Sequence, residues 1–200
     1  LEDVNILLNN SREKSALSND TTLNVKSKLT QVLAAIVRRY DPTRLVTAGC
    51  NEVSPDNNLF KSGALDVIGF NYHQQKVKDV QKNFPGKPFL MTETVSALQT
   101  RGYYRMPSDS LYRMPGRKRP FTDPTFLCSA YDNSCAYWGS THETTWDVVK
   151  HTPYCAGQFI WTGFDYIGEP TPFNFPARSS YFGLVDLAGF PKDSYYMYQS

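Results

Sequence analysis

Short apolar runs alternate along the chain with segments that have a helical pattern. Continuous apolar runs are typical of strands buried on both faces, and intervening helices are typical of a parallel sheet. The sequence therefore predicts an α/β fold. The expected strands are Leu45–Cys50, Leu65–Phe70, Pro88–Thr92 and Cys155–Trp161, and the expected helices are 21–40, 74–83 and 140–151, with a last one opened by Pro191-Lys192-Asp193.

Two of these helices carry additional signals. In the first, apolar residues recur at spacings of three and four, which predicts one continuous apolar face; they are Leu29, Val32, Leu33, Ile36, Val37 and Tyr40. Asp20 or Thr21 is the expected cap, and Arg38 and Arg39 suit the C-terminal end, where the helix dipole favours cations. Before the third helix, Ser140 and Glu143 have the spacing of a capping box.

Each apolar run is followed by polar residues that could carry chemistry. Asn51-Glu52 follows the first, Asn71-Tyr72-His73 the second, and Thr162 to Pro170 the fourth. The third run, in Lys87 to Ala97 (KPFLMTETVSA), stops at Glu93. In parallel α/β folds function gathers at the carboxyl ends of the strands. Glu93 is thus a candidate catalytic carboxylate, or else a surface residue held by an ion pair.

The segment from about 103 to 139 interrupts the alternation. It has no periodicity and is rich in Pro, Tyr, Arg and Ser. Loops of this length in compact domains are usually functional or disordered, and the many aromatic residues argue against disorder. We expect it to pack over the pocket on the strand-to-helix side. Arg117-Lys118-Arg119 is interpreted as a solvated tip rather than a nucleic-acid site.

Four strands of this kind do not close a barrel, which needs about eight. Residues 1–200 are therefore expected to be the second half of a (β/α)8 TIM barrel, with strands five to eight. We expect one domain segment, belonging to a longer protein, with no second domain.

Composition narrows the function. Aromatic residues make up 14% of the chain. Their flat apolar faces and polar tips suit a pocket for sugars, although a large aromatic core is the simpler explanation. The net charge of +2 gives no basis for binding nucleic acid or a membrane surface. Cys128 and Cys135 could pair in an oxidising compartment, whereas Cys50 and Cys155 read as buried thiols. No cysteine or histidine spacing predicts a metal site.

Several longer motifs resemble glycoside hydrolase family 2, and in particular its bacterial β-galactosidases. They are PTRLVTAGCN, TET with the following VSAL and TRGY, GQFIWTGFDYIGEP and SSYFGLVDLAGFPKD. The resemblance covers the chain from about Thr21. It implies a TIM-barrel catalytic domain that acts by a retaining mechanism through a covalent glycosyl-enzyme.

The resemblance also implies roles for individual residues. Glu93 matches the nucleophile, and Tyr72 matches a tyrosine that hydrogen-bonds it. Trp161 matches the platform under the sugar ring. Asp165 and Glu169 could accept hydrogen bonds from sugar hydroxyls, or form structural ion pairs. Asn71 and His73 could lie at the rim of the pocket, although structural hydrogen bonds would explain them equally well.

One feature of the family is missing. The family's acid/base glutamate follows an asparagine at the end of strand four, and no Asn-Glu precedes the helix 21–40. The pair Asn51-Glu52 follows strand five instead of strand four, which makes Glu52 a weak candidate for the acid/base. We expect the acid/base to lie upstream of Leu1, and the isolated chain to be inactive.

Other assignments remain open. The expected reaction is hydrolysis of terminal β-D-galactosyl residues; a β-mannosidase or β-glucuronidase is an alternative. A glucuronidase would be expected to carry an Asn-x-Lys clamp, which is absent between Trp161 and Lys192. A non-catalytic sugar-binding segment is a third possibility. No cofactor is expected. The expected partners are a carbohydrate and the rest of the barrel with its β-sandwich domains, in a periplasmic or extracellular setting.

Overall fold

The computed structural model describes residues 23–113 and 128–200, and these fall into two compact units. The first unit ends at Thr92 and also contains 152–158. The second contains 93–151 and 159–200. Residues 89–95 and 155–161 each form a strand that begins in the first unit and ends in the second. The basic cluster Arg117-Lys118-Arg119 and the expected caps Asp20 and Thr21 lie outside the described residues.

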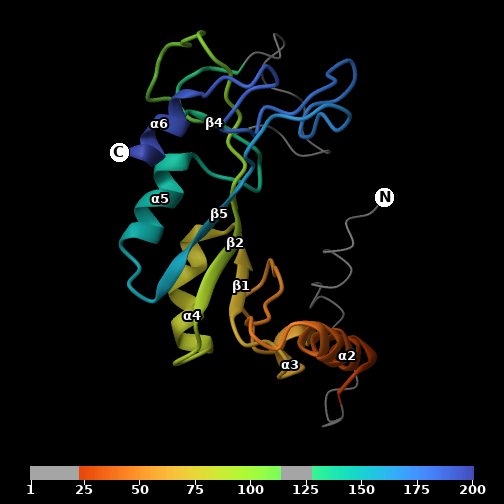
Figure 1. Ribbon diagram of the computed structural model, residues 1–200. Helices are drawn as coiled ribbons and strands as arrows, with labels where there is room; N and C mark the ends of the chain where they lie inside the picture. The colour runs from red at the N-terminus through yellow and green to blue at the C-terminus, as the bar shows by residue number, and fades with distance from the viewer. Residues whose placement is uncertain (1–22, 114–127) are drawn as a thin grey trace. The chain divides into compact units, whose positions relative to one another are not determined.

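A three-stranded sheet with the order β1-β2-β5 forms the centre of the first unit. Its strands are β1 (Ile68–Asn71), β2 (Phe89–Val95) and β5 (Cys155–Trp161). They run in the same direction (Figure 1). The 3-10 helix η1 (Gln74–Lys76) and α4 (Val77–Asn83) connect β1 to β2. Val77 and Val80 are buried on the inner face of α4.

The expected strand at Leu45–Cys50 does not form a regular strand, which corrects that prediction. Its bonds to the β1 region include two between backbones, from Asp66 N to Val46 O and from Asn71 N to Cys50 O, and one from the Thr47 hydroxyl to Val67 O. Between these points the backbones approach too closely for a side chain. A Cβ on Gly69 would lie 2.3 Å from Ala48 O. This close approach at a glycine replaces the regular ladder of hydrogen bonds.

The long helix α2 (Val25–Tyr40) confirms the expected helix, but its cap is Asn24. The side chain of Asn24 accepts from Ser27 N at 2.9 Å. The short α3 (Asn58–Lys61) follows and is capped by Asn57 in the same way. In both cases a side-chain oxygen satisfies one of the backbone N–H groups left unpaired at a helix start.

Polar residues of α2 face the protein. Ser27 donates to Asn58 O, Gln31 donates to Ser62 O, and Arg38 donates to Ala64 O and Asp66. The apolar face is turned away: Leu29, Val32, Leu33, Ile36 and Val37 are 47–55% exposed. The predicted apolar face therefore exists, but the described residues leave it uncovered. The bonds on the opposite face explain this orientation.

The second unit is built from loops and two helices around an aromatic core. Its helices are α5 (His142–Lys150) and α6 (Asp193–Gln199). They contact each other through Tyr198, whose ring lies edge-on to His142 and Trp146. Two short parallel strands, β3 (Tyr112–Arg113) and β4 (Ser134–Cys135), pair within the long loop. The core cluster is Leu98, Cys128, Ala136, Phe173 and Phe182.

The start of α5 differs from the predicted capping box. Thr141, not Ser140, is the cap, and its side chain accepts from Thr144 N. Asp132, from the loop, accepts from the backbone N–H groups of His142 and Glu143 at 3.0 and 2.8 Å. The carboxylate of Asp132, rather than that of Glu143, therefore helps to cap the start of α5. A helix N-terminus can be stabilised by an anion from any part of the chain.

The α/β class is confirmed in a coarser form than predicted: the described residues make a small mixed α/β assembly. The partial (β/α)8 barrel remains a prediction. All four cysteines are free thiols, so Cys128 and Cys135 are not bonded to each other here. Within 23–113 and 128–200, no cluster of side chains could hold a metal ion. No helix in these same ranges is long and apolar enough to cross a membrane.

Candidate active site

Glu93 lies within β2 rather than at its end. The strand continues to Val95, two residues beyond the predicted stop. Side chains alternate along a strand, so Glu93 faces the side opposite to its neighbour Thr94. Thr94 is fully buried and donates to Phe159 O at 2.9 Å, whereas Glu93 is partly exposed. The strand thus anchors its inner face through Thr94 and presents the carboxylate on the other.

Trp161 ends β5 and is partly accessible. It is 37% exposed, so it is not a pure core residue. Its ring lies nearly perpendicular to that of Tyr166, at 81° and 6.3 Å between centroids. The indole N–H also donates a hydrogen bond to the Tyr166 hydroxyl. A partly exposed tryptophan held in orientation by a second aromatic ring suits stacking against a sugar ring.

Tyr166 packs against the indole of Trp161 and is influenced by the charges of two carboxylates of this unit. Burial raises the pKa of Tyr166, and the negative charges of Glu169 and Glu93 raise it further. Glu93, Trp161 and Tyr166 all belong to the second unit, and the charge of Glu93 acts on the Tyr166 hydroxyl. Sequence reasoning missed Tyr166. The available signal was its place in GFDYIGEP, directly after the residues that end the strand.

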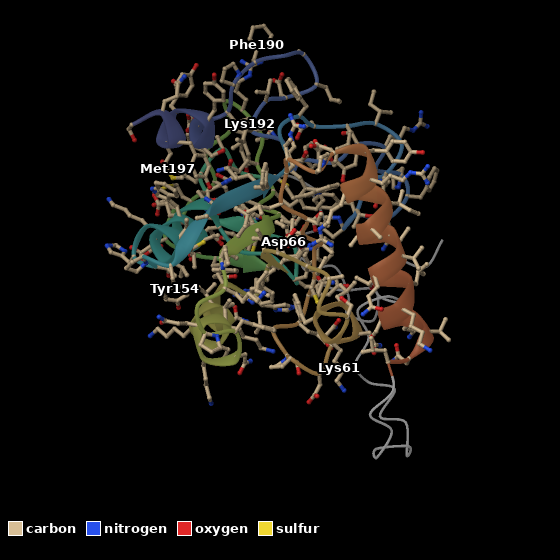
Figure 2. All side chains as sticks on the ribbon, turned by 60° about the horizontal axis from the view of Figure 1, so that its bottom comes forward. Lys61, Asp66, Tyr154, Phe190, Lys192 and Met197 are labelled. Carbon is tan, nitrogen blue, oxygen red and sulfur yellow. The ribbon has the colours of Figure 1, made fainter. Side chains whose placement is uncertain are left out.

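The two acidic residues beyond Trp161 have different surroundings. Asp165 forms an ion pair with Lys192 at 2.8 Å, and its side chain is only 6% exposed. It also accepts from Gly183 N at 2.7 Å. Asp165 thus fits the structural alternative rather than contact with a sugar. Glu169 is exposed and accepts from the Thr171 hydroxyl at 3.1 Å. Figure 2 shows Lys192 among packed side chains and Phe190 at the periphery.

Three predicted site residues belong to the first unit. Asn71 is buried at the end of β1, and its Oδ1 accepts from the Thr92 hydroxyl at 2.6 Å. Tyr72 and His73 follow with positive φ angles of 52° and 47°. Burial lowers the pKa of His73, and Lys76 lowers it further. Asn71 thus has a structural bond, while Tyr72 and His73 occupy a tight turn directly after the strand.

Glu52, the weak acid/base candidate, is held by a helix cap. Its Oε2 accepts from Asn57 Nδ2 at 3.1 Å. Asn57 is in turn the cap of α3. This arrangement explains Glu52 as a residue that orients a capping side chain.

Comparison with known proteins gives the class of protein. No family model matches the chain. The chain is 55% identical over 201 residues to the β-galactosidase BoGH2A of Bacteroides ovatus, covering 100% of the chain and 24% of that protein. It is 31% identical to a Formosa agariphila protein with a provisional β-glucuronidase name, covering 92% of the chain and 19% of that protein.

A solved structure shares the fold. The β-D-glucuronidase of Dictyoglomus thermophilum matches with a TM-score of 0.61 at 16% identity, over 88% of this chain and 29% of that one. These relatives are glycosidases. The chain belongs to glycoside hydrolase family 2, as its motifs indicate. The match to BoGH2A runs the length of the chain. The chain spans a quarter or less of the curated relatives it matches.

Proposed function

We propose that the chain forms part of the catalytic domain of a retaining β-galactosidase in which Glu93 is the nucleophile. The observation that carries this proposal is the grouping of Glu93 with the Trp161–Tyr166 pair in one unit. A carboxylate beside an oriented aromatic platform can attack the anomeric carbon of a sugar stacked on that platform. The similarity to a β-galactosidase over the whole chain supports galactose as the sugar.

The reaction would proceed in two displacements. A carboxylate oxygen of Glu93 bonds to the anomeric carbon while the bond to the leaving oxygen breaks, and a carboxylic acid protonates that oxygen. Water then attacks the same carbon, gives its proton to that second carboxylate, and releases galactose and Glu93. In retaining enzymes the two carboxyl groups are about 5–5.5 Å apart. We assign the second one to a part of the protein outside this chain, because Glu52 already supports a helix cap.

Tyr72 is proposed as the hydrogen-bond partner of Glu93. It directly follows β1, the strand next to β2 in the sheet. The resemblance to glycoside hydrolase family 2, in which a tyrosine at the matching position hydrogen-bonds the nucleophile, supports this pairing. A phenol that donates to the carboxylate would keep Glu93 ionised, which the first displacement requires.

The exposed apolar face of α2 supports the proposal that this chain is part of a larger domain. Five aliphatic side chains of one helix are about half exposed. Contiguous exposed apolar surface usually marks a contact. We propose that the rest of a (β/α)8 barrel covers this face, with the present chain contributing strands five to eight.

A fluorosugar trap tests the nucleophile. Incubation of the intact enzyme with a 2-deoxy-2-fluoro galactosyl fluoride should label the peptide that contains Glu93. Glu93→Gln should lower turnover by orders of magnitude, because it removes the covalent route. Glu143→Gln, an exposed glutamate on α5, is the matched control and should retain activity. Label on any other peptide would overturn the assignment.

A β-glucuronidase is the second candidate, since one curated relative and one solved structure carry that name. A panel of aryl β-galactosides, β-glucuronides and β-mannosides separates the candidates. We expect the highest kcat/KM for the galactoside. A preference for the glucuronide would reassign the substrate and leave the role of Glu93 intact.

A further inference from the structure

The backbone immediately after Glu93 is strained. Val95 has a φ of 74° and Ser96 a φ of 53°. Ser96 N donates to Thr94 O at 3.1 Å, so Thr94–Val95–Ser96 is a γ-turn. Its central φ is that of the rarer form, near about +75°, which is strained. Positive φ in a β-branched residue is an outlier, so Val95 would not adopt this conformation without external restraint.

Segment 134–140 of the long loop supplies that restraint. Its backbone forms three hydrogen bonds to the turn and the residues after it: Ser140 N to Val95 O at 2.7 Å, Ala136 N to Ser96 O at 3.0 Å, and Leu98 N to Ser134 O at 2.8 Å. The indole N–H of Trp138 adds a side-chain bond to Ser96 Oγ at 3.2 Å. We call this segment the clamp. All of these contacts lie within the second unit.

Gly139 brings the clamp closer to the turn than any other residue could. A Cβ on Gly139 would lie 2.2 Å from Val95 O and 3.1 Å from the Ser96 Cβ. The obstacle is backbone, which cannot move aside as a flexible side chain can. Both partners are also buried: Val95 is 1% exposed and Ser96 0%. The clamp and the turn are therefore fitted at the level of their backbones.

We propose that the clamp positions Glu93 for the displacement reaction, with Trp138 and Gly139 as its positioning residues. Strained backbone persists only where surrounding structure over-determines it, and it gathers at functional sites. Glu93 lies two residues before Val95, so the path of the turn sets the direction in which β2 presents the carboxylate. An error of about 1 Å in a reacting group can cost a hundredfold in rate. This inference rests on the proposed role of Glu93.

The proposal gives a function to a loop that sequence alone only marks as irregular. The clamp does not touch the carboxylate by any contact described above. It acts through the backbone, by preventing Val95 and Ser96 from relaxing to negative φ. Loss of the clamp should therefore slow the formation of the glycosyl-enzyme more than it weakens sugar binding.

Two variants of the intact enzyme test the inference. Trp138→Phe removes the N–H bond to Ser96 together with the five-membered ring of the indole, and keeps an aromatic ring at the position. Gly139→Ala forces the backbones apart. We expect kcat and the rate of fluorosugar labelling to fall by about tenfold to a hundredfold, while KM changes by less than about threefold. Tyr196→Phe, a change on an exposed ring of α6 outside the clamp, should leave both rates unchanged.

A double-variant cycle separates positioning from simple destabilisation. Ser96→Ala removes the acceptor of the Trp138 bond, so Trp138→Phe should lower the labelling rate less in that background than in the wild type. If Glu93 is labelled but both clamp variants react at the wild-type rate, the positioning role is wrong and the proposed function stands. If the wild-type label is found elsewhere, both fail. A fall in melting temperature with unchanged labelling per folded enzyme also counts against positioning.

Discussion

Lys192 Nζ lies 2.8 Å from Asp165 Oδ1, and both side chains are buried, at 0% and 6% exposed. The ammonium also donates to Gln99 O at 2.7 Å and Tyr181 O at 3.2 Å. Burial lowers the pKa of Lys192 and raises that of Asp165, and their mutual hydrogen bond opposes both shifts. One side chain therefore joins the segment after β2, the loop after Trp161 and the start of α6.

Removal of the ammonium should destabilise the protein strongly. Lys192→Met would leave Asp165 as a buried carboxylate without its cation, which typically costs about 3–5 kcal/mol. Urea unfolding of the intact protein measures this change. Lys150→Met, at an exposed position on α5, should cost less than about 0.5 kcal/mol. Equal stability of the two variants would show that the buried pair contributes little.

Tyr166→Phe should reduce kcat/KM by roughly tenfold, because the Trp161 indole loses its acceptor and the platform loses a fixed orientation. Steady-state kinetics with an aryl β-galactoside measure this. Tyr196→Phe, on an exposed ring of α6, is the control. If both variants keep wild-type kcat/KM, Tyr166 does not support the platform.

A charge on the apolar face of α2 distinguishes a covered helix from an exposed one. If the rest of a barrel packs on this face, Leu33→Asp should destabilise the intact protein by several kcal/mol, since it buries an unpaired charge. Lys28→Asp, at an exposed position on the same helix, should have a small effect. Unfolding midpoints measure the difference. A harmless Leu33→Asp would mean that the face remains in water.

His142 should make the stability of the protein sensitive to acid. Burial, and to a smaller extent the positive charge of Lys192, lower the pKa of His142 to about 3. The ring nitrogen Nδ1 lies 3.2 Å from the Tyr198 hydroxyl. The folded state resists protonation of this ring more than the unfolded state does. Stability is therefore full above the unfolded pKa of about 6.5 and decreases as the pH falls toward 3.

The pH dependence of stability that Asp132 contributes has the opposite sign, so its effect must be distinguished from that of His142. Burial raises the pKa of Asp132 to about 6, so its contribution is greatest at low pH and is lost as the pH rises through 6. Unfolding of wild type and His142→Gln at pH 7.5 and 4.5 isolates the histidine. The advantage of the wild type should shrink at pH 4.5. A constant difference would contradict the lowered pKa.

The strands and helices that follow from periodicity were largely predictable. The limits of β5 agree with the expected Cys155–Trp161. Contacts between distant segments were not predictable. Neither the close approach at Gly69 nor the cap from Asp132 leaves a local pattern, because both depend on residues ten or more positions away. The orientation of α2 depends likewise on Asp66 and Ser62.

The candidate site shows the same division. Glu93 and Trp161 could be identified from motifs, but Tyr166 and the turn at Val95 could not. Valine disfavours positive φ, so a valine at position 95 argues against a turn of this kind in the sequence. Only the clamp explains why the turn exists. Sequence reasoning also left Asp165 between two roles, and its ion pair with Lys192 favours the structural one.

The strained turn at Val95 and Ser96 has a consequence for directed evolution. Selection for heat resistance should favour residues there that tolerate left-handed backbone, such as glycine or asparagine at position 96, because they release stored strain. Variants selected in this way would hold the nucleophile less firmly and would have a lower kcat. Thermal tolerance and catalytic speed should therefore trade against each other at these two positions, more sharply than elsewhere on the same strand.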